Sequence, residues 1–315
     1  KHAELNLRLV LGEHAALLLG EQTDAGLQRC ERERCDALLV LPGEDAARDG
    51  QQPQPHGRAL GSESRLDCAR VEGSRPPTLT WRRSNMRPGV LAASDALFSR
   101  LQRSRPFFLF AGPNVVESTE RCVRLAGAIR DVADRLGLTF VFKASFDKAN
   151  RTSGCSYRGP GLDGGLHALR AVRERIGVPV LSDVHEPAQA ALAAEVVDVL
   201  QIPAFLCRQT DLLAAAAGTG RIVHIKKGQW CGPATMAAAA DKVRAAGNPR
   251  VIVCERGTAF GYNDQLVDPR SLVWLREAGG LVTADVTHAL QLPGCRVDAA
   301  GDVCAGGHRE LIPAI

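Results

Sequence analysis

From residue 107 onward, short apolar runs alternate with longer stretches rich in Ala, Leu and Arg. The apolar runs are FFLFAGP (107–113), TFVFKASF (139–146), PVLSDVH (179–185), VLQIPA (199–204), IVHIKKG (222–228), VIVCERG (251–257) and LVTADVTH (281–288). This alternation is typical of βα units, in which parallel strands are joined by helices. The pattern predicts seven such units.

Helices are predicted between these strands, and several begin with Ser, Asp or Pro, which are favoured at helix starts. Their expected ranges are Glu117–Leu136, Gly164–Ile176, Pro187–Val196, Asp211–Ala217, Pro233–Ala246 and Pro269–Glu277. Seven consecutive units without a Gly-x-Gly-x-x-Gly turn favour a closed (β/α)8 TIM barrel over a doubly wound sheet. No eighth unit follows, so we predict an α/β barrel whose last βα unit is missing from this chain.

Residues 1–85 have a different composition, since Trp81 is their only aromatic residue. Apolar patches at Leu5–Leu19 and Ala37–Leu41 predict one short helix and one short strand, and the segment QQPQPHGRALGSESR is typical of a linker. We therefore predict that residues 1–85 are a poorly structured extension or linker outside the working module. Residues 86–315 then form the incomplete TIM-barrel domain.

The composition excludes several classes of protein. With 315 residues, 45% hydrophobic residues, 23% charged residues and a net charge of +4, the chain has the profile of a soluble globular protein. No apolar run approaches the ~18 residues of a membrane span, and basic clusters with aromatic platforms are lacking, so we expect neither membrane nor nucleic-acid partners. Ten cysteines without a C-x-x-C pair, and no secretory signal, favour a cytoplasmic location.

In a barrel of this kind the active site lies at the carboxyl ends of the strands. Polar residues follow every predicted strand: Asn114, Lys143, Asp183 with His185, Gln201, Lys226 with Lys227, Glu255 with Arg256, and Asp285 with His288. Seven polar strand ends on one rim, mixing cations, carboxylates and imidazoles, indicate a functional site.

Lysine usage supports this interpretation, because the chain has only six Lys against 33 Arg. Four of the lysines follow just two strands: Lys143, Lys148, Lys226 and Lys227. Together with Arg151, Arg208 and Arg256 they predict a cationic pocket suited to substrates that carry phosphate and carboxylate groups.

Eight segments resemble a known family: FAGPNVVES, VFKASFDKANRTS, SYRGPG, SDVHEP, QIPAFLCRQTDLL, IKKGQ, CERGTAFGYND and ADVTHALQ. In this order they resemble the 3-deoxy-D-manno-octulosonate 8-phosphate synthases, and the tail GGHRELIPAI brings the chain closest to the plant-type form. The resemblance covers residues 98–315 and fails before residue 86. KANRTS is its most specific element, since the sister enzyme of the shikimate pathway has a K-P-R-T-S-like segment there.

The resemblance implies condensation of phosphoenolpyruvate with D-arabinose 5-phosphate and water, giving 3-deoxy-D-manno-octulosonate 8-phosphate and phosphate. In the family mechanism, C3 of the enol attacks the aldehyde, water adds to C2, and the resulting hemiketal phosphate expels phosphate by C–O cleavage. Because two phosphates and a carboxylate enter one site, about four or more cations are needed to offset substrate repulsion.

On the phosphoenolpyruvate side, matching motifs assign Lys226 and Arg256 to the phosphate, and Arg208 adds charge to one of the two phosphates. Gln201 is a further expected ligand of this substrate. The resemblance assigns Lys143 and Lys148 to the carboxylate and to polarisation of the reacting atoms.

On the arabinose 5-phosphate side, the resemblance implies binding by Asn150, Arg151 and Thr152 together with Lys148, and contact of Asp183 with the sugar hydroxyls. Asn114 and His288 complete the expected catalytic set. Some residues have structural alternatives: Glu117 as an early-helix residue, Asp183 with His185 as a hydrogen-bonded pair, and Glu255 as the partner of an Arg.

Some members of the family hold a divalent metal through a Cys at the end of the first strand together with His, Glu and Asp, and others use none. Here Asn114 occupies the first-strand position, and an amide is a poor ligand for soft or borderline metals. We therefore predict a metal-independent enzyme without a cofactor, despite the presence of His288, and a homo-oligomer when complete.

The departure from the family is at the carboxyl terminus, since residues 107–315 are fewer than the about 250 of a typical TIM barrel. We expect the chain to be a fragment or an incomplete gene model. Two alternatives stay open: a catalytically dead phosphate-binding barrel, and a sister synthase using erythrose 4-phosphate or an N-acyl mannosamine.

Overall fold

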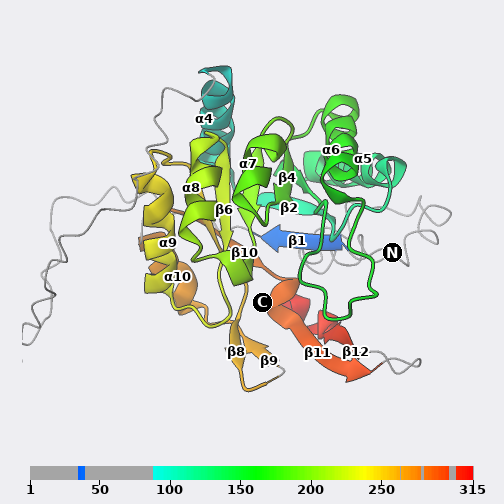
Figure 1. Cartoon of the computed structure of the whole chain (residues 1–315), viewed down its shortest axis with the longest axis vertical. Helices are drawn as coiled ribbons and strands as arrows, with labels where there is room; N and C mark the ends of the chain where they lie inside the picture. The colour runs from blue at the N-terminus through cyan, green and yellow to red at the C-terminus, as the bar shows by residue number, and fades with distance from the viewer. Residues whose placement is uncertain (1–34, 40–87, 263, 278–279, 298–302, 315) are drawn as a thin grey trace, which may run out of the picture. The chain divides into compact units, whose positions relative to one another are not determined.

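The computed structural model describes residues 35–39, 88–262, 264–277, 280–297 and 303–314. Its main sheet contains seven strands that run parallel to their neighbours: β2 (Phe108–Pro113), β3 (Thr139–Lys143), β4 (Val180–Asp183), β5 (Val199–Ile202), β6 (Ile222–Lys226), β7 (Val251–Glu255) and β10 (Leu281–Asp285). They lie side by side in sequence order (Figure 1). All seven predicted strands are confirmed.

The predicted helices between the strands are confirmed as well, with ends that shift by a few residues. They are α5 (Thr119–Arg135), α6 (Gly161–Ile176), α7 (Pro187–Ala193), α8 (Thr210–Gly218), α9 (Pro233–Ala245) and α10 (Arg270–Glu277). Local signals explain their ends, because the Ser118 side chain accepts the backbone N–H of Arg121 at the start of α5. Pro begins α7 and α9, and the left-handed Gly177 ends α6.

An eighth strand, β1 (Cys35–Leu39), closes the sheet into a barrel between β2 and β10 (Figure 1). It runs antiparallel to both neighbours, with five residues paired to β2 and two paired to β10. The described residues contain no eighth parallel strand, in agreement with the missing βα unit. The sequence predicts a strand near Ala37–Leu41 but places it outside the module, whereas the structure adds β1 to the barrel.

The rest of the predicted N-terminal extension, including the patch Leu5–Leu19, lies outside the described residues. The boundary at residue 85 therefore stays a prediction, apart from the five residues of β1 that the barrel includes.

The barrel has two layers of apolar packing. The larger layer lies between the strands and the surrounding helices. The smaller one fills the barrel interior, where Phe110, Val141, Leu181 and Ile252 are fully buried. Continuous apolar strands are expected for this arrangement, because a parallel sheet is covered on both faces.

A helix that precedes β2, α4 (Pro88–Arg103), closes one end of the barrel. Its Leu97 and Leu101 belong to the interior cluster together with Phe108 and Ile222, the first residues of β2 and β6. An ion pair of 2.6 Å between Asp95 and Arg250 joins this helix to the residue preceding β7. The amino ends of the strands are therefore covered by α4.

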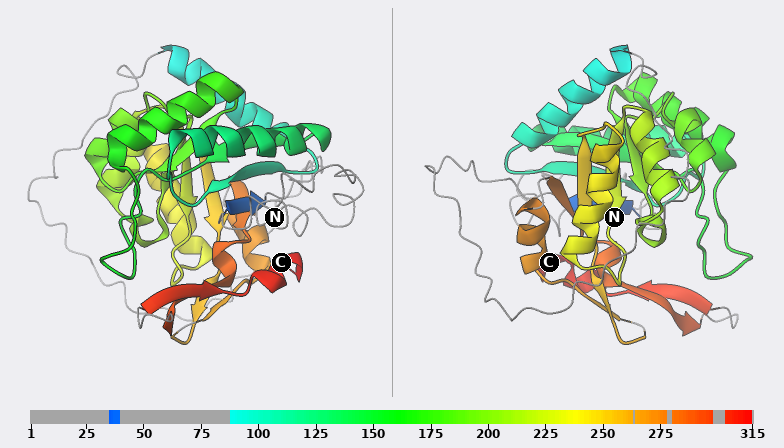
Figure 2. Two further views of the ribbon diagram at one scale, coloured as in Figure 1. Left: turned by 90° about the vertical axis from the view of Figure 1, so that its right-hand side faces the viewer. Right: turned by 60° about the vertical axis from the view of Figure 1, so that its left-hand side comes forward.

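Two hairpins lie at the opposite end, beyond the carboxyl ends of the strands (Figure 2). They are β8 (Thr258–Phe260) with β9 (Asp264–Leu266), and β11 (Gln291–Val297) with β12 (Val303–Gly307). The first follows β7 directly, and the second follows β10 after the short helix η4 (His288–Leu290). No described helix is long and apolar enough to cross a membrane.

Candidate active site

A cavity of about 530 Å³ opens at the carboxyl ends of the strands. Eleven of the twelve residues expected in the site line it: Asn114, Lys143, Lys148, Asn150, Arg151, Thr152, Asp183, Gln201, Lys226, Arg256 and His288. Arg208 does not line this cavity and is exposed. The strand-end residues Lys227, Glu255 and Asp285 also do not line the cavity. The roles expected for the lining residues stay predictions.

The lining is strongly cationic. Its five basic side chains are Lys143, Lys148, Arg151, Lys226 and Arg256, whereas Asp183 is the one carboxylate among its residues. Lys143, Lys226 and Arg256 are almost fully buried, at 2%, 6% and 5% exposure. Positive charge held in a poorly solvated hollow attracts anions more strongly than the same charge in water.

The carboxylate of Asp183 lies at the end of β4, and its Oδ2 is 3.4 Å from His185 Nε2. Burial alone would raise the pKa of Asp183, but the charges of Lys148, His185 and Lys143 outweigh it and hold the pKa well below its usual range. Its Oδ1 is buried without a hydrogen-bond partner among the described residues. Asp183 is therefore an ionised acceptor with one oxygen available to a hydroxyl group. The hydrogen-bonded pair with His185 and contact with substrate are compatible.

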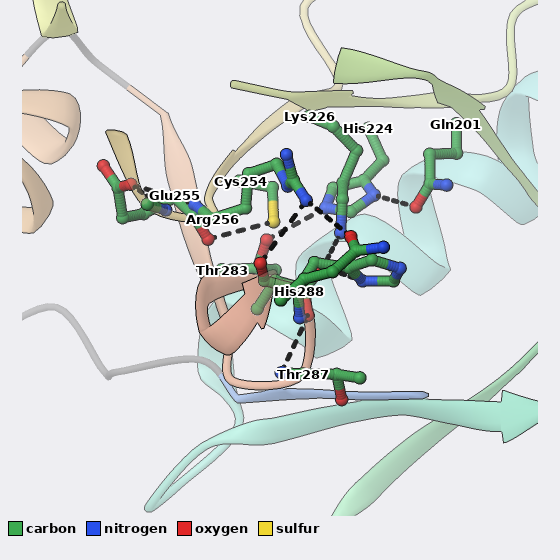
Figure 3. Close-up of polar contacts among 12 residues, drawn as sticks. Gln201, His224, Lys226, Cys254, Glu255, Arg256, Thr283, Thr287 and His288 are labelled. Atoms are coloured by element: carbon green, nitrogen blue, oxygen red, sulfur yellow. Dashed lines mark hydrogen bonds and ion pairs between the residues drawn. The ribbon is translucent and has the colours of Figure 1, made fainter. Parts of the chain in front are cut away.

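Beneath the cavity, Asp285 at the end of β10 links two of its lining residues. The carboxylate pairs with Lys226, and its Oδ2 also lies 2.7 Å from His288 Nδ1 (Figure 3). Backbone N–H groups of Thr287 and His288 donate to the other oxygen, at 3.1 and 2.9 Å. Despite complete burial, which by itself raises the pKa, these contacts hold the pKa of Asp285 well below its usual range. Asp285 thus fixes both the ammonium and the imidazole.

A buried imidazole also supports the floor of the site. His224 Nδ1 lies 3.2 Å from Gln201 Oε1, and its Nε2 lies 2.9 Å from Thr283 Oγ1 (Figure 3). Burial and the nearby Lys226 hold its pKa well below the usual value, so the ring is neutral. His224 therefore orients the Gln201 amide from below.

Arg256 follows β7 and reaches across the site. Its Nη2 donates to His288 O and Gln291 Oε1, both at 3.4 Å, and burial lowers its pKa from the usual value. These contacts are long and come from neutral acceptors, so the guanidinium keeps donors for an anion.

The loop between β3 and α6 forms the opposite side of the cavity. It carries Lys148, whose N–H donates to Arg158 O at 2.7 Å, and Arg151, whose Nε donates to Tyr157 O at 3.2 Å. Arg158 in turn forms an ion pair of 2.5 Å with Asp147 at the base of the loop. These contacts fold the segment back on itself and place its basic residues toward the cavity.

The described residues do not fit a divalent metal. No group of three or more His, Cys, Asp or Glu residues in this part of the chain is arranged to hold an ion. Asn114 supplies only an amide, whose Oδ1 is buried without a hydrogen-bond partner, and the Nδ1 of His288 is taken by Asp285.

Two glutamates near the strand ends, Glu117 and Glu255, form ion pairs. Glu117 does not line the cavity and forms an ion pair with Arg121, but it lies just before the N-cap Ser118 and not within α5. Glu255 does pair with a cation, but that cation is Lys227 and not an Arg.

Four cysteines lie within the residues that form the barrel and its loops from β3 onward: Cys155, Cys207, Cys231 and Cys254. Cys207, Cys231 and Cys254 are buried, while Cys155 is exposed. Burial raises the pKa of Cys207 and Cys254 to about 11, so neither is a thiolate nucleophile at neutral pH.

Several lining residues were not expected from the sequence, including Phe205, Gln229 and Gln291. His224 and Thr283 were missed because they lie inside strands, not at their ends. A signal for His224 was present, since it is the one polar residue in the run IVHI.

Comparison with known proteins gives these features a family. The model of the DAHP synthetase I family matches residues 102–311. The chain belongs to this family. The match begins at the end of α4 and includes all seven parallel strands, so the DAHP synthetase I module coincides with the barrel that carries the cationic cavity.

Within the DAHP synthetase I family, the relatives share one name. The chain is 55% identical to "2-dehydro-3-deoxyphosphooctonate aldolase 1" of Arabidopsis thaliana over 225 residues, 71% of this chain and 78% of that protein. It is 54% identical to "2-dehydro-3-deoxyphosphooctonate aldolase" of Pisum sativum, over 73% of this chain and 78% of the relative. A relative of the same name in Acidithiobacillus ferrooxidans is 51% identical, over 67% and 73%. This name denotes the synthase family that the motifs resemble, so that resemblance is confirmed, including its plant-type character.

Proposed function

We propose that this chain condenses phosphoenolpyruvate with D-arabinose 5-phosphate and water to give 3-deoxy-D-manno-octulosonate 8-phosphate and inorganic phosphate. The observation that carries the proposal is the cavity with five cations and a single carboxylate among its lining residues. Two phosphates and one carboxylate can share such a hollow only if several cations offset their mutual repulsion. The names of the relatives support the same reaction.

Phosphoenolpyruvate fits the side of the cavity formed by β6 and β7. Lys226 and Arg256 provide a compact ammonium and a planar fork, the two donor types suited to a phosphate. Lys143 and Lys148 then receive the carboxylate, with Gln201 fixed beside them by His224. Arg208 lies outside this cavity, so its assigned role has no support within a single chain.

Arabinose 5-phosphate fits the other side, where the β3–α6 loop contributes Asn150, Arg151 and Thr152. Arg151 receives the phosphate in this arrangement. The unpartnered oxygen of Asp183 accepts a sugar hydroxyl, and the ionised state of this residue makes that hydrogen bond a strong one.

The chemistry then proceeds between the two anion-binding sides. C3 of phosphoenolpyruvate forms a bond to the aldehyde carbon of the sugar, whose oxygen takes up a proton. Water adds to C2, and the C–O bond to phosphate breaks to leave the C2 keto group. Lys143 stabilises negative charge that develops near the carboxylate, while Lys226 and Arg256 stabilise the departing phosphate.

Asp285 has a second part in this scheme. It neutralises Lys226, which limits the cost of burying that ammonium. A lysine has three N–H donors, so Lys226 can keep Asp285 and still donate to phosphate.

The test is a phosphate-release assay with phosphoenolpyruvate and each of three acceptors: arabinose 5-phosphate, erythrose 4-phosphate and an N-acyl mannosamine. Release with the first acceptor alone supports the proposal, and release with another would assign the chain to a sister activity. Isothermal titration with phosphoenolpyruvate runs alongside. Binding without turnover for any acceptor would support a catalytically dead phosphate-binding module.

Three properties belong to the proposal and need their own tests. Asn114 in the first-strand position supports a metal-independent reaction. Where the structure describes cysteine side chains, at Cys122, Cys155, Cys207, Cys231 and Cys254, the thiols are free, which supports a reducing, cytoplasmic location. The expected homo-oligomer rests on the family resemblance, and size-exclusion chromatography with light scattering measures it.

A further inference from the structure

Lys227 follows Lys226 directly, yet it does not line the cavity. Successive residues of a strand point to opposite sides, so the two ammonium groups at the end of β6 diverge. The Lys227 side chain is 1% exposed, and its Nζ lies 3.3 Å from Glu255 Oε1. It donates to Gly257 O at 2.9 Å, Thr258 Oγ1 at 3.0 Å and Cys231 O at 3.4 Å. All of its donors are used within the chain.

Glu255 is equally enclosed, with a side chain that is 2% exposed. Its Oε1 accepts the backbone N–H groups of Arg256 at 2.9 Å and Gly257 at 2.7 Å, and its Oε2 accepts Ser271 Oγ at 2.6 Å. Figure 3 shows the Glu255 side chain pointing away from the Arg256 guanidinium. This carboxylate therefore binds the backbone that carries Arg256 and leaves the cavity to other residues.

The geometry points to a positioning role for this pair: we infer that Lys227 and Glu255 set the place of Arg256 and Lys226 for the phosphate of phosphoenolpyruvate. The inference rests on the proposed function. Neither residue touches the substrate in this scheme.

Two features make the phosphate site depend on the buried pair. The guanidinium of Arg256 is held only by two contacts of 3.4 Å among those described for it, so its position follows mainly from its backbone. Glu255 fixes that backbone by accepting two N–H groups, and Lys227 fixes it by donating to Gly257 O. Gly257 has a φ of 88°, in the left-handed region that favours glycine. The turn after β7 is thus tied to the end of β6.

Energetics favour a geometric role over a stabilising one. The free energy of removing two opposite charges from water is about as large as the free energy of their attraction, so buried ion pairs add little net stability. Their hydrogen bonds are nevertheless directional and strong when satisfied on both sides. The partners of this pair lie in the loop between β6 and α9, in the β7–β8 turn, at the start of β8 and in α10.

The experiment compares steady-state kinetics and thermal unfolding of Lys227→Met, Glu255→Gln and the double variant in the full chain. We expect Lys227→Met to raise the KM for phosphoenolpyruvate about tenfold, as loss of one charged hydrogen bond would. The KM for arabinose 5-phosphate should change by less than about twofold, because the β3–α6 loop is untouched. The double variant should recover thermal stability but not the KM, since it removes the unpaired charge without restoring the ties.

A matched control lies at the other end of the same strand. Arg221, just before β6, forms a buried ion pair with Asp198 at 3.4 Å, with side chains 6% and 11% exposed. Arg221→Met should lower the unfolding temperature as Lys227→Met does, but leave the KM for phosphoenolpyruvate unchanged. If both variants shift that KM alike, or if Lys227→Met leaves it unchanged, the positioning role is refuted.

A milder variant and a binding measurement keep the inference testable if Lys227→Met does not fold. Ser271→Ala removes one hydrogen bond to Glu255, and we expect it to weaken phosphoenolpyruvate binding about threefold, as a modest hydrogen bond would. Calorimetric titration with inorganic phosphate measures the same subsite without turnover. If the wild-type chain binds phosphate but turns over no acceptor, the proposed function fails while the positioning role is still measured. Unchanged phosphate affinity in Ser271→Ala would overturn the positioning role.

Discussion

Replacing Leu38 by Pro tests whether β1 closes the barrel. Leu38 is paired on both sides, with Phe110 of β2 and Asp285 of β10. Proline has no N–H donor, and its ring does not fit a strand that has neighbours on both edges. Because Asp285 binds Lys226 and His288, a disturbance at Leu38 also reaches the proposed phosphate site.

The size of the effect follows from the pairing. Residues in an antiparallel ladder alternate between pairs that share two hydrogen bonds and pairs that share none. The seven residue pairs of β1 therefore correspond to about seven hydrogen bonds, each worth about 1 kcal/mol net. Loss of the donor at position 38 and of its adjacent pairs should cost about 2–4 kcal/mol, a large part of the about 5–15 kcal/mol that stabilises a domain. The unfolding temperature should fall by roughly 5–15 °C.

The assay is calorimetric or circular-dichroism unfolding of Leu38→Pro beside Leu38→Val, which keeps the N–H group. Phosphate release and size-exclusion profile are measured on the same samples, because an open barrel exposes strand edges that invite association. The loss of one net hydrogen bond shifts the unfolding temperature by more than about 1 °C. If the unfolding temperatures of Leu38→Pro and Leu38→Val differ by less than that, β1 is not part of the working barrel. The predicted boundary at residue 85 would then stand unaltered.

Four further predictions concern the cavity. Lys143→Ala should lower kcat, measured by steady-state phosphate release, by several orders of magnitude. Lys143→Arg should not restore it, because a planar guanidinium cannot replace the compact ammonium, and activity of Lys143→Ala within about threefold of wild type would refute the role of Lys143. Arg151→Ala should raise the KM for arabinose 5-phosphate far more than that for phosphoenolpyruvate, and equal effects would mean that the two anion sides are exchanged. EDTA or dipicolinate should leave the rate unchanged, and Mn²⁺ or Zn²⁺ should not raise it; a loss restored by metal would contradict the assignment based on Asn114. The folded-state pKa of Asp183 lies below its usual value, so its contribution to stability is present above about pH 4 and is lost only as the pH falls further. In a plot of unfolding temperature against pH, Asp183→Asn should therefore show a smaller decrease below about pH 4 than the wild type.

The barrel strands and helices could be predicted because their signals are local. An apolar run such as VIVCE determines a buried strand within a few residues, and Ser118 or Gly177 marks a helix end by its own hydrogen bonds. The rim of the site followed from the same reasoning, because parallel strands bring their carboxyl ends together.

The parts that were missed depend on contacts distant in sequence. β1 pairs with β2 and β10 across long stretches of chain, and nothing in the patch Ala37–Leu41 specifies an antiparallel neighbour. Lys226 and Lys227 are identical, adjacent and both buried, and only the direction of their side chains places Lys226 at the cavity and Lys227 away from it. Arg208, which the motifs place with the phosphate ligands, follows η3 (Ala204–Leu206) and lies outside the cavity of a single chain.

The packed floor of the barrel determines how substrates and products reach the cavity. Phe110, Val141, Leu181 and Ile252 fill the interior, and Leu97 and Leu101 of α4 cover its amino end. In the described chain the cavity is therefore closed toward the barrel interior and open only at the carboxyl ends of the strands. Both substrates enter and both products leave through the same mouth between the β3–α6 loop and the β6 and β7 ends. Because substrates and products share this mouth, a product that is still bound blocks the entry of the next substrate, so we expect both products to inhibit the reaction.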